Sequence, residues 1–146
     1  MGKQNIYIKH IRIIFILLAI FFTIIIGFIF FPLDSKFNFF GLIAALAFIS
    51  FFLGIALIIL TIKSDIKCKP RAYLLMTGAS IAGILSFSIL HNLLYAMEIL
   101  TTNIPIIPNI FGFIHGFSFI MAVLVCPIGF VIGIIGTITL TLKKTK

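Results

Sequence analysis

Residues 77–98 read TGASIAGILSFSILHNLLYAME, and this stretch carries the features that decide the fold. Apolar residues dominate it, as expected of a helix that crosses lipid. Small residues recur in its first half and polar residues in its second half. Advancing each position by about 100° places the small residues on one broad side and most of the polar residues on another. We therefore predict a transmembrane helix with small-residue contacts to its neighbours and a separate polar stripe.

The rest of the chain has the same apolar character. Of the 146 residues, 62% are hydrophobic and 10% are charged, whereas soluble domains carry about 25% charged residues. Four continuous runs each reach the roughly 20 residues that a helix needs to cross a hydrocarbon core, and they lack the alternation of barrel strands. We predict one all-α domain over residues 1–146, an integral membrane four-helix bundle with helices at residues 11–31, 39–62, 72–97 and 117–142.

Positive charge is concentrated on one side of the predicted membrane. The formal net charge is +8, and every Lys and Arg except Lys36 precedes the first run, links the second to the third, or follows the fourth. Basic residues favour the cytoplasmic side, so we predict a multi-pass cell-membrane protein with both termini in the cytoplasm. The same flanks predict contacts with anionic lipid headgroups, and this placement argues against nucleic acid as a partner.

Small residues predict where the helices approach one another most closely, because they let two backbones come together in lipid. The first run is nearly all Ile, Leu and Phe, and we expect it to face lipid. In the fourth run Pro127 lacks a backbone N–H, which predicts a kink. The predicted packing positions are Ser50, Gly54, Ala79, Gly83, Gly129, Gly133 and Gly136.

The third link, residues 99–116, differs from the other two. It is longer, apolar, free of Lys and Arg, and interrupted by Pro105 and Pro108. We expect it to lie in the outer membrane interface or to fold back over the bundle. A lid over a site is the sharper alternative.

One polar cluster is the candidate site. Ionisable groups at membrane depth are costly in lipid and normally face protein or water. In the functional interpretation the cluster forms a small pocket or a proton relay, since histidine side chains titrate near neutrality. In the structural interpretation the same groups hydrogen-bond to neighbouring helices and the carboxylate marks the water boundary. The cluster comprises Ser88, His91, Asn92, Tyr95, Glu98 and His115.

Specific catalytic patterns are missing from the sequence. His91, His115 and Glu98 are metal-ligand types without a spacing such as HExxH, so a metal site stays an open possibility. The two cysteines form no CxxC pair, and Ser88 has no nucleophile elbow. We therefore name no catalytic residue, predict no cofactor, and leave open whether the chain is an enzyme.

Three segments carry a resemblance to known sequences. TGASIAG (residues 77–83), LHNLLYA (90–96) and VCPIGFVIG (125–133) together resemble small multi-pass membrane proteins of bacteria and archaea. The resemblance covers mainly the third and fourth runs. It implies a four-helix membrane protein and no particular activity.

Three functions follow as hypotheses. The first is a non-enzymatic membrane component that packs with itself or with a larger membrane partner, because the short links leave the membrane face as its main contact surface. The second is a cation or proton carrier or channel that uses the polar cluster. The third is an intramembrane enzyme acting on lipid, which rests only on the buried polar groups and the third link.

Overall fold

The fold is entirely helical in the part of the chain that the structure describes. The structure is a computed structural model, and it describes residues 2–30, 40–66 and 68–143. Four helical segments in these ranges are long and apolar enough to cross a membrane, which confirms the predicted all-α class. The helices are α1 (Gly2–Phe30), α2 (Phe40–Lys63), α3 (Cys68–Leu100), α4 (Ile107–Ile120), the π-helical turn η1 (Met121–Val125) and α5 (Cys126–Leu142).

Helix ends differ most from the predicted ends at two places. Helix α1 begins at Gly2, so Lys9 and Arg12 lie within the helix and not ahead of it. Helix α4 begins at Ile107, which shows that the predicted long link or lid over residues 99–116 is wrong. Pro108 lies in the first turn of α4. Proline is tolerated there because the N–H of any other residue at that position would have no acceptor within the helix. The proline therefore starts a helix here and does not interrupt one.

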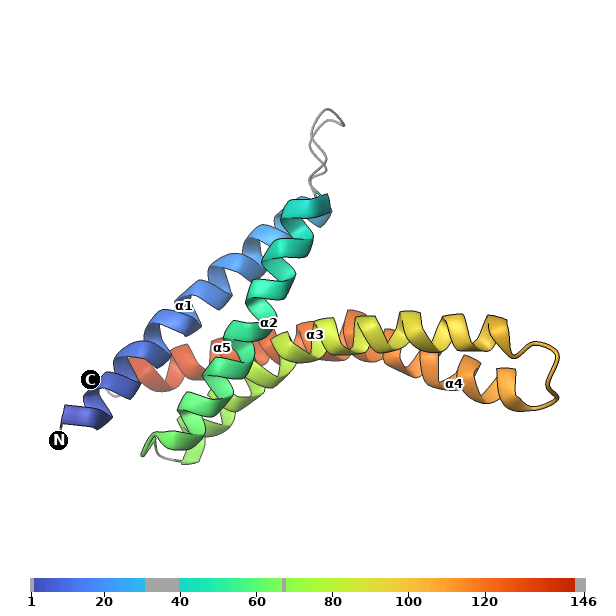
Figure 1. The fold of residues 1–146 in the computed structure, drawn as a ribbon. Coiled ribbons are helices and arrows are strands. Elements are labelled where there is room, and N and C mark those ends of the chain that lie inside the picture. The colour runs from blue at the N-terminus through green and yellow to red at the C-terminus, as the bar shows by residue number, and fades with distance from the viewer. Residues whose placement is uncertain (1, 31–39, 67, 144–146) are drawn as a thin grey trace.

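The turn between α3 and α4 is short and strained. Residues 101–106 connect the two helices. At its end Ile106 has φ 78°, a backbone conformation that a β-branched residue rarely adopts. The turn reverses the chain direction tightly, so α4 returns along α3 as the second half of a helical hairpin (Figure 1).

Helix α3 is the central helix of the arrangement. It packs against α2 on one side and against α4, η1 and α5 along its length, whereas α1 packs mainly against α2. Helix α4 makes no extensive contact with α1 or α2 in the described ranges. Figure 1 shows the result: the α1–α2 hairpin and the α3–α4 hairpin diverge from a shared base. The four helices are packed, but they do not run together as one bundle over their whole length.

Two glycines bring α2 and α3 into backbone contact. A Cβ atom built on Gly54 would lie 2.9 Å from the carbonyl oxygen of Gly78, and one built on Gly78 would lie 2.8 Å from that of Gly54. Side chains of Ile81 and Ile58 close around the same point. Only glycine at both positions permits this separation, so the crossing of α2 over α3 is set by these two residues.

Glycines of α5 have the same role on the opposite side of α3. A Cβ atom on Gly129 would lie 2.6 Å from the Ser80 hydroxyl oxygen. A Cβ atom on Gly133 would collide with Thr77, and one on Gly136 with the ring of Tyr73. The α3 residues that fill the space beside these glycines are polar or amphipathic. Helices α3 and α5 therefore pack closely, with the α5 glycines against two hydroxyl groups and a tyrosine ring of α3.

Of the other three predicted packing positions, Ser50 and Gly83 are packed and Ala79 is exposed. Ser50 is buried, and a Cβ atom on Gly83 would lie 2.7 Å from Cys126 Sγ. Ala79 instead is exposed, because the residues on either side of it, Gly78 and Ser80, face α2 and α5. A helix can present only part of its circumference to neighbours, and Ala79 lies outside that part.

Helix α1 has one packed side, contrary to the prediction that it faces lipid. Leu18 is fully buried, Ile11 is nearly so, and both belong to the hydrophobic core. The ring of Phe22 lies 4.4 Å from that of Phe130, centroid to centroid, and this contact joins α1 to α5. The expectation that α1 only faces lipid is therefore wrong for one side, while residues such as Ile16 and Ile20 remain exposed.

An irregular turn precedes Pro127. The backbone N–H of Cys126 donates to the carbonyl of Met121, which widens η1 to a π-helical turn. Such turns occur where a helix accommodates a packing or hydrogen-bonding irregularity. Pro127 stays the predicted position of a kink, and the structure adds a second cause of bending in the same region.

The glycine crossing generates a stability prediction. The Gly54→Ala substitution places a methyl group against backbone atoms of α3. It should lower the free energy of unfolding by about 1–3 kcal/mol, the usual cost of overpacking. Gly27→Ala is the matched control, because no atom beyond its own helical backbone and its chain neighbours lies within 4 Å of a Cβ there. Reversible unfolding in mixed micelles measures both. Equal stability of the two variants would contradict the proposed role of Gly54.

Candidate functional site

The polar stripe of α3 faces the last part of the chain. Thr77 and Ser80 lie against glycines of α5, and farther along the helix His91 and Glu98 lie against α4. The Thr77 hydroxyl also donates to the carbonyl of Tyr73 at 2.9 Å within its own helix. The stripe is thus a contact between helices along much of its length, and its ionisable groups lie toward the α3–α4 turn.

Glu98 and His115 form the strongest contact of the cluster. Glu98 Oε2 lies 2.7 Å from His115 Nδ1, across the α3–α4 interface. Both atoms are shielded from the surroundings, and neither makes a hydrogen bond of good geometry to another described group. The side chains as a whole are partly open, with 31% of Glu98 and 22% of His115 exposed. An ion pair of this exposure contributes at most about 1 kcal/mol, so it orients the two side chains more than it stabilises the fold.

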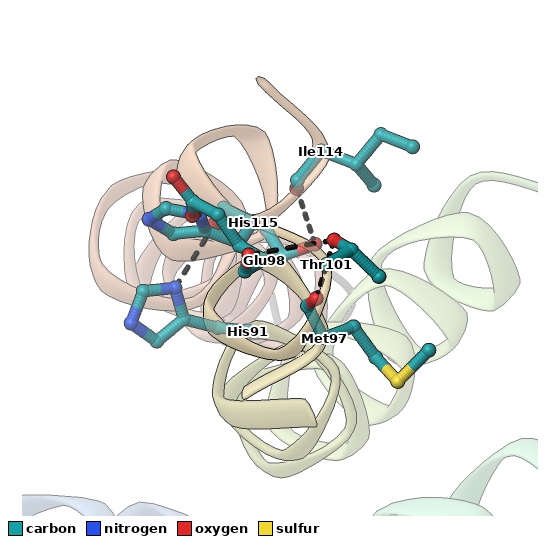
Figure 2. Close-up of polar contacts among 7 residues, drawn as sticks. His91, Met97, Glu98, Thr101, Ile114 and His115 are labelled. Atoms are coloured by element: carbon teal, nitrogen blue, oxygen red, sulfur yellow. Dashed lines mark hydrogen bonds and ion pairs between the residues drawn. The ribbon is translucent and has the colours of Figure 1, made fainter. Parts of the chain in front are cut away.

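His91 joins the pair through the backbone of α4. Its Nδ1 atom lies 3.0 Å from the carbonyl oxygen of His115. A carbonyl oxygen only accepts, so His91 Nδ1 carries the hydrogen and donates it. The rings of His91 and His115 are 5.1 Å apart, centroid to centroid. Figure 2 shows the side chains of His91, Glu98 and His115 gathered on the same side of the hairpin.

Aromatic rings border the two histidines. The Tyr95 ring meets that of His115 edge to face at 5.5 Å, and the Phe119 ring lies 5.3 Å from that of His91. Tyr95 is 52% exposed, so it covers the cluster from the outside and does not enclose it.

Two predicted members of the cluster lie apart from it. The Ser88 hydroxyl donates to the carbonyl of Ile84 at 2.7 Å, and the Asn92 amide donates to the carbonyl of Ser88 at 2.8 Å. Both bonds are internal to α3, and Asn92 is exposed. The structure therefore brings together His91, Tyr95, Glu98 and His115, whereas the side-chain hydrogen bonds of Ser88 and Asn92 go to the backbone of their own helix.

Gly112 makes room for the ion pair, and this role is not among the predictions from the sequence. A Cβ atom on Gly112 would lie 3.1 Å from Glu98 Oε1, whereas one on Gly116 would meet nothing within 4 Å. The absence of a side chain at Gly112 lets the carboxylate lie flat against α4. The signal was present in the sequence as a glycine one helical turn before His115, but it has no meaning until residues 107–116 are known to be helical.

The site has two limits on its chemistry. Its contacts come from α3 and α4, so within one chain two helices define it. Among the described residues no group of three or more His, Cys, Asp or Glu side chains is placed to hold a metal ion. The arrangement places a carboxylate beside an imidazole between two helices, and the described part of the chain builds no multi-helix enclosure around it.

Comparisons with known proteins give no family. No family model, no curated protein and no solved structure matches the chain. The class of the protein therefore rests on its own residues: four packed, long, apolar helices define a small multi-pass membrane protein.

Proposed function

We propose that this protein is a non-enzymatic membrane assembly component that associates with a second copy of itself. The surface concerned is the outer arm, defined as residues 89–120, which comprises the end of α3, the turn and α4. The single observation that carries the proposal is the isolation of this arm from α1 and α2 (Figure 1).

The length of the arm supports an intermolecular role. The spans Lys69–Leu100 and Ile107–Leu142 contain 32 and 36 residues. At 1.5 Å per residue they extend about 48–54 Å, against a hydrocarbon core of about 30 Å. Spans that exceed the bilayer tilt, bend or associate. A tilted two-helix arm presents both of its outer sides to the membrane, and neither α1 nor α2 packs extensively against them in the described ranges.

Asn92 gives this surface a means of association. Its side chain is exposed on an otherwise apolar face, and its amide group has hydrogen-bonding capacity beyond the single bond to Ser88. Exposed leucines surround it, among them Leu93 at 58% exposure. A polar side chain in such a position is stabilised by a partner across a helix interface. Two copies related by a two-fold axis bring one Asn92 to the other and satisfy both.

The self-association predicts a measurable effect of Asn92→Leu. Interhelical hydrogen bonds in membranes contribute about 0.6–1.7 kcal/mol, so the dimer dissociation constant should rise about 3- to 20-fold. Energy transfer between donor- and acceptor-labelled copies in vesicles, measured over a range of protein-to-lipid ratios, gives this constant.

Thr23→Val is the matched control for that experiment. Thr23 is also exposed on a membrane-spanning helix, but its hydroxyl donates to the carbonyl of Ala19 within α1. We expect Thr23→Val to leave energy transfer unchanged. If energy transfer in the wild-type protein is no greater than the transfer expected of randomly distributed copies, self-association is refuted. If Asn92→Leu leaves the dimer dissociation constant unchanged, Asn92 does not lie in the interface.

The proposed orientation places both termini in the cytoplasm. Figure 1 places the two ends of the chain and the α2–α3 link at the same end of the molecule, away from the α3–α4 turn. The described basic residues at that end include Lys9, Arg12, Lys69, Arg71 and Lys143. Such residues favour the cytoplasmic side and attract anionic headgroups, at about 1 kcal/mol for each residue near the surface.

A reporter fused after residue 146 tests this orientation in a bacterial inner membrane. Green fluorescent protein should fluoresce there, because it folds in the cytoplasm, and alkaline phosphatase at the same position should be inactive. The reverse pattern would contradict the orientation.

A further inference from the structure

We propose that Lys9 and Arg12 form a binding site for the phosphate group of an anionic phospholipid, and that an acyl chain of this lipid lies along exposed isoleucines of α1. The site rests on the attraction of the basic end for anionic headgroups proposed above, and it assigns that attraction a defined place. It does not depend on self-association, because both basic residues belong to one chain. Four features of α1 support the proposal.

The first feature is a hollow in the surface of α1 that two basic and two apolar side chains line. The lining residues are Ile8, Lys9, Arg12 and Ile13. All four are exposed, and residues three and four apart are neighbours on a helix surface. A guanidinium group binds phosphate oxygens through two parallel hydrogen bonds, and an ammonium group adds a compact charge with further donors. The hollow therefore offers cationic donors for one phosphate beside an apolar surface.

The second feature is that neither basic side chain has an anionic partner. Lys9 and Arg12 form no hydrogen bond or ion pair with another residue in the described part of the chain. The whole chain contains three acidic residues, and the carboxylate of one of them, Glu98, faces His115 near the α3–α4 turn. Basic side chains near a membrane surface are stabilised by anionic headgroups. Because the described part of the chain offers these two residues no anion, a lipid phosphate is the available partner.

The third feature is the position of the pair along α1. From Lys9 to Phe30 the helix rises about 32 Å at 1.5 Å per residue, which matches a hydrocarbon core of about 30 Å. The two basic residues therefore lie at one boundary of the core. Lysine and arginine at such a boundary keep their stems along apolar surface and extend their charged groups toward the headgroups. The pair is thus at the level of lipid phosphates.

The fourth feature is an apolar surface that continues from the hollow toward the membrane centre. Ile16, Ile20 and Ile24 are exposed, and their spacing of four residues keeps them on one side of α1. At about 100° per residue Leu18 lies on the opposite side, where it is fully buried. The exposed isoleucines therefore face away from the protein core. An acyl chain whose phosphate is held in the hollow can lie along them.

Quenching of a single tryptophan by brominated lipid tests the site, because the chain contains no tryptophan of its own. Full-length protein with Ile20→Trp is placed at one chain per nanodisc in phosphatidylcholine. In parallel samples, part of this lipid is replaced by phosphatidylglycerol or by phosphatidylcholine with bromine in the middle of its acyl chains. The ratio of the two quenching constants gives the local preference for the anionic lipid. We expect a preference of about 5- to 30-fold, the range for one or two basic residues near an anionic surface.

Phe52→Trp is the matched reference position. Phe52 is 65% exposed on α2 and lies about 16 Å from the end of that helix at Lys63, as Ile20 lies about 16 Å from Lys9. The two tryptophans therefore have similar distances from the basic end of the molecule, and only the tryptophan of Ile20→Trp follows the hollow. The preference at Phe52→Trp should be several-fold weaker.

Charge variants in the Ile20→Trp protein separate the site from the general attraction. Lys9→Gln and Arg12→Gln should each lower the preference about fivefold, and the double variant should lower it to the value of Phe52→Trp. Lys69→Gln is the control, because Lys69 is exposed at the start of α3, with which α1 has no extensive contact. It removes the same charge at the same end of the molecule and should leave the preference unchanged.

Circular dichroism confirms that each variant keeps its helix content before the preferences are compared. An equal preference in Ile20→Trp and Phe52→Trp overturns the site and leaves the general attraction, whereas no preference in either overturns both. An unchanged preference in the Lys9→Gln, Arg12→Gln double variant overturns the site, and so does a loss of preference in Lys69→Gln. Soluble glycerol phosphate should leave the preference unchanged. If it abolishes the preference, the hollow binds free phosphate and the assignment to a lipid is wrong.

Discussion

Close backbone contact on two sides of α3 is the constraint on which the rest of the structure depends. On one side Gly54 and Gly78 bring α2 and α3 together, and on the other side Gly129, Gly133 and Gly136 admit Ser80, Thr77 and Tyr73 of α3. In lipid the hydrophobic effect does not drive helices together, so packing at such positions supplies the association. Both contacts lie in the first half of α3. Helix α4 packs against α3 and η1 and makes no extensive contact with α1 or α2 in the described ranges, so α4 and the end of α3 form a separate hairpin.

The isolated hairpin explains why the polar residues are arranged as they are. A two-helix arm has little apolar interface, and the Glu98–His115 contact with the His91 bond to the α4 backbone adds specific links across it. These links fix the register of α3 against α4, because Glu98 fits only opposite the space left at Gly112. The same geometry leaves Asn92 on an exposed face of the hairpin. The assembly property proposed for the arm is thus a consequence of its isolation.

Parts of this organisation could be predicted from the sequence and parts could not. The four spans are predictable because length and hydropathy determine them, and the common face of His91 and Glu98 follows from a polar stripe at helical spacing on one helix. The approach of His115 to this face depends on α4 returning along α3. The start of α4 was not predictable in this way, because Pro108 at a helix start and Pro108 in a loop give the same sequence signal. Ala79 and Gly78 are both small, and only the direction of approach of α2 and α5 decides which of them is buried. The divergence of the two hairpins depends on a crossing angle, which no periodicity in one sequence specifies.

The divergence of the hairpins is the central claim, and one distance in a bilayer tests it most directly. Spin labels at Gly41→Cys and Asn109→Cys, with Cys68 and Cys126 replaced by Ala, mark the described start of α2 beyond the crossing and the start of α4 at the far end of the outer arm. Both positions are exposed, so the labels do not disturb the packing. The distance is measured by pulsed electron–electron double resonance in nanodiscs, with labelled protein diluted in unlabelled protein. The distance between the two labels should be far longer than the spacing of about 10 Å between packed helices. A short, narrow distance distribution typical of adjacent helices in a closed four-helix bundle would contradict the account.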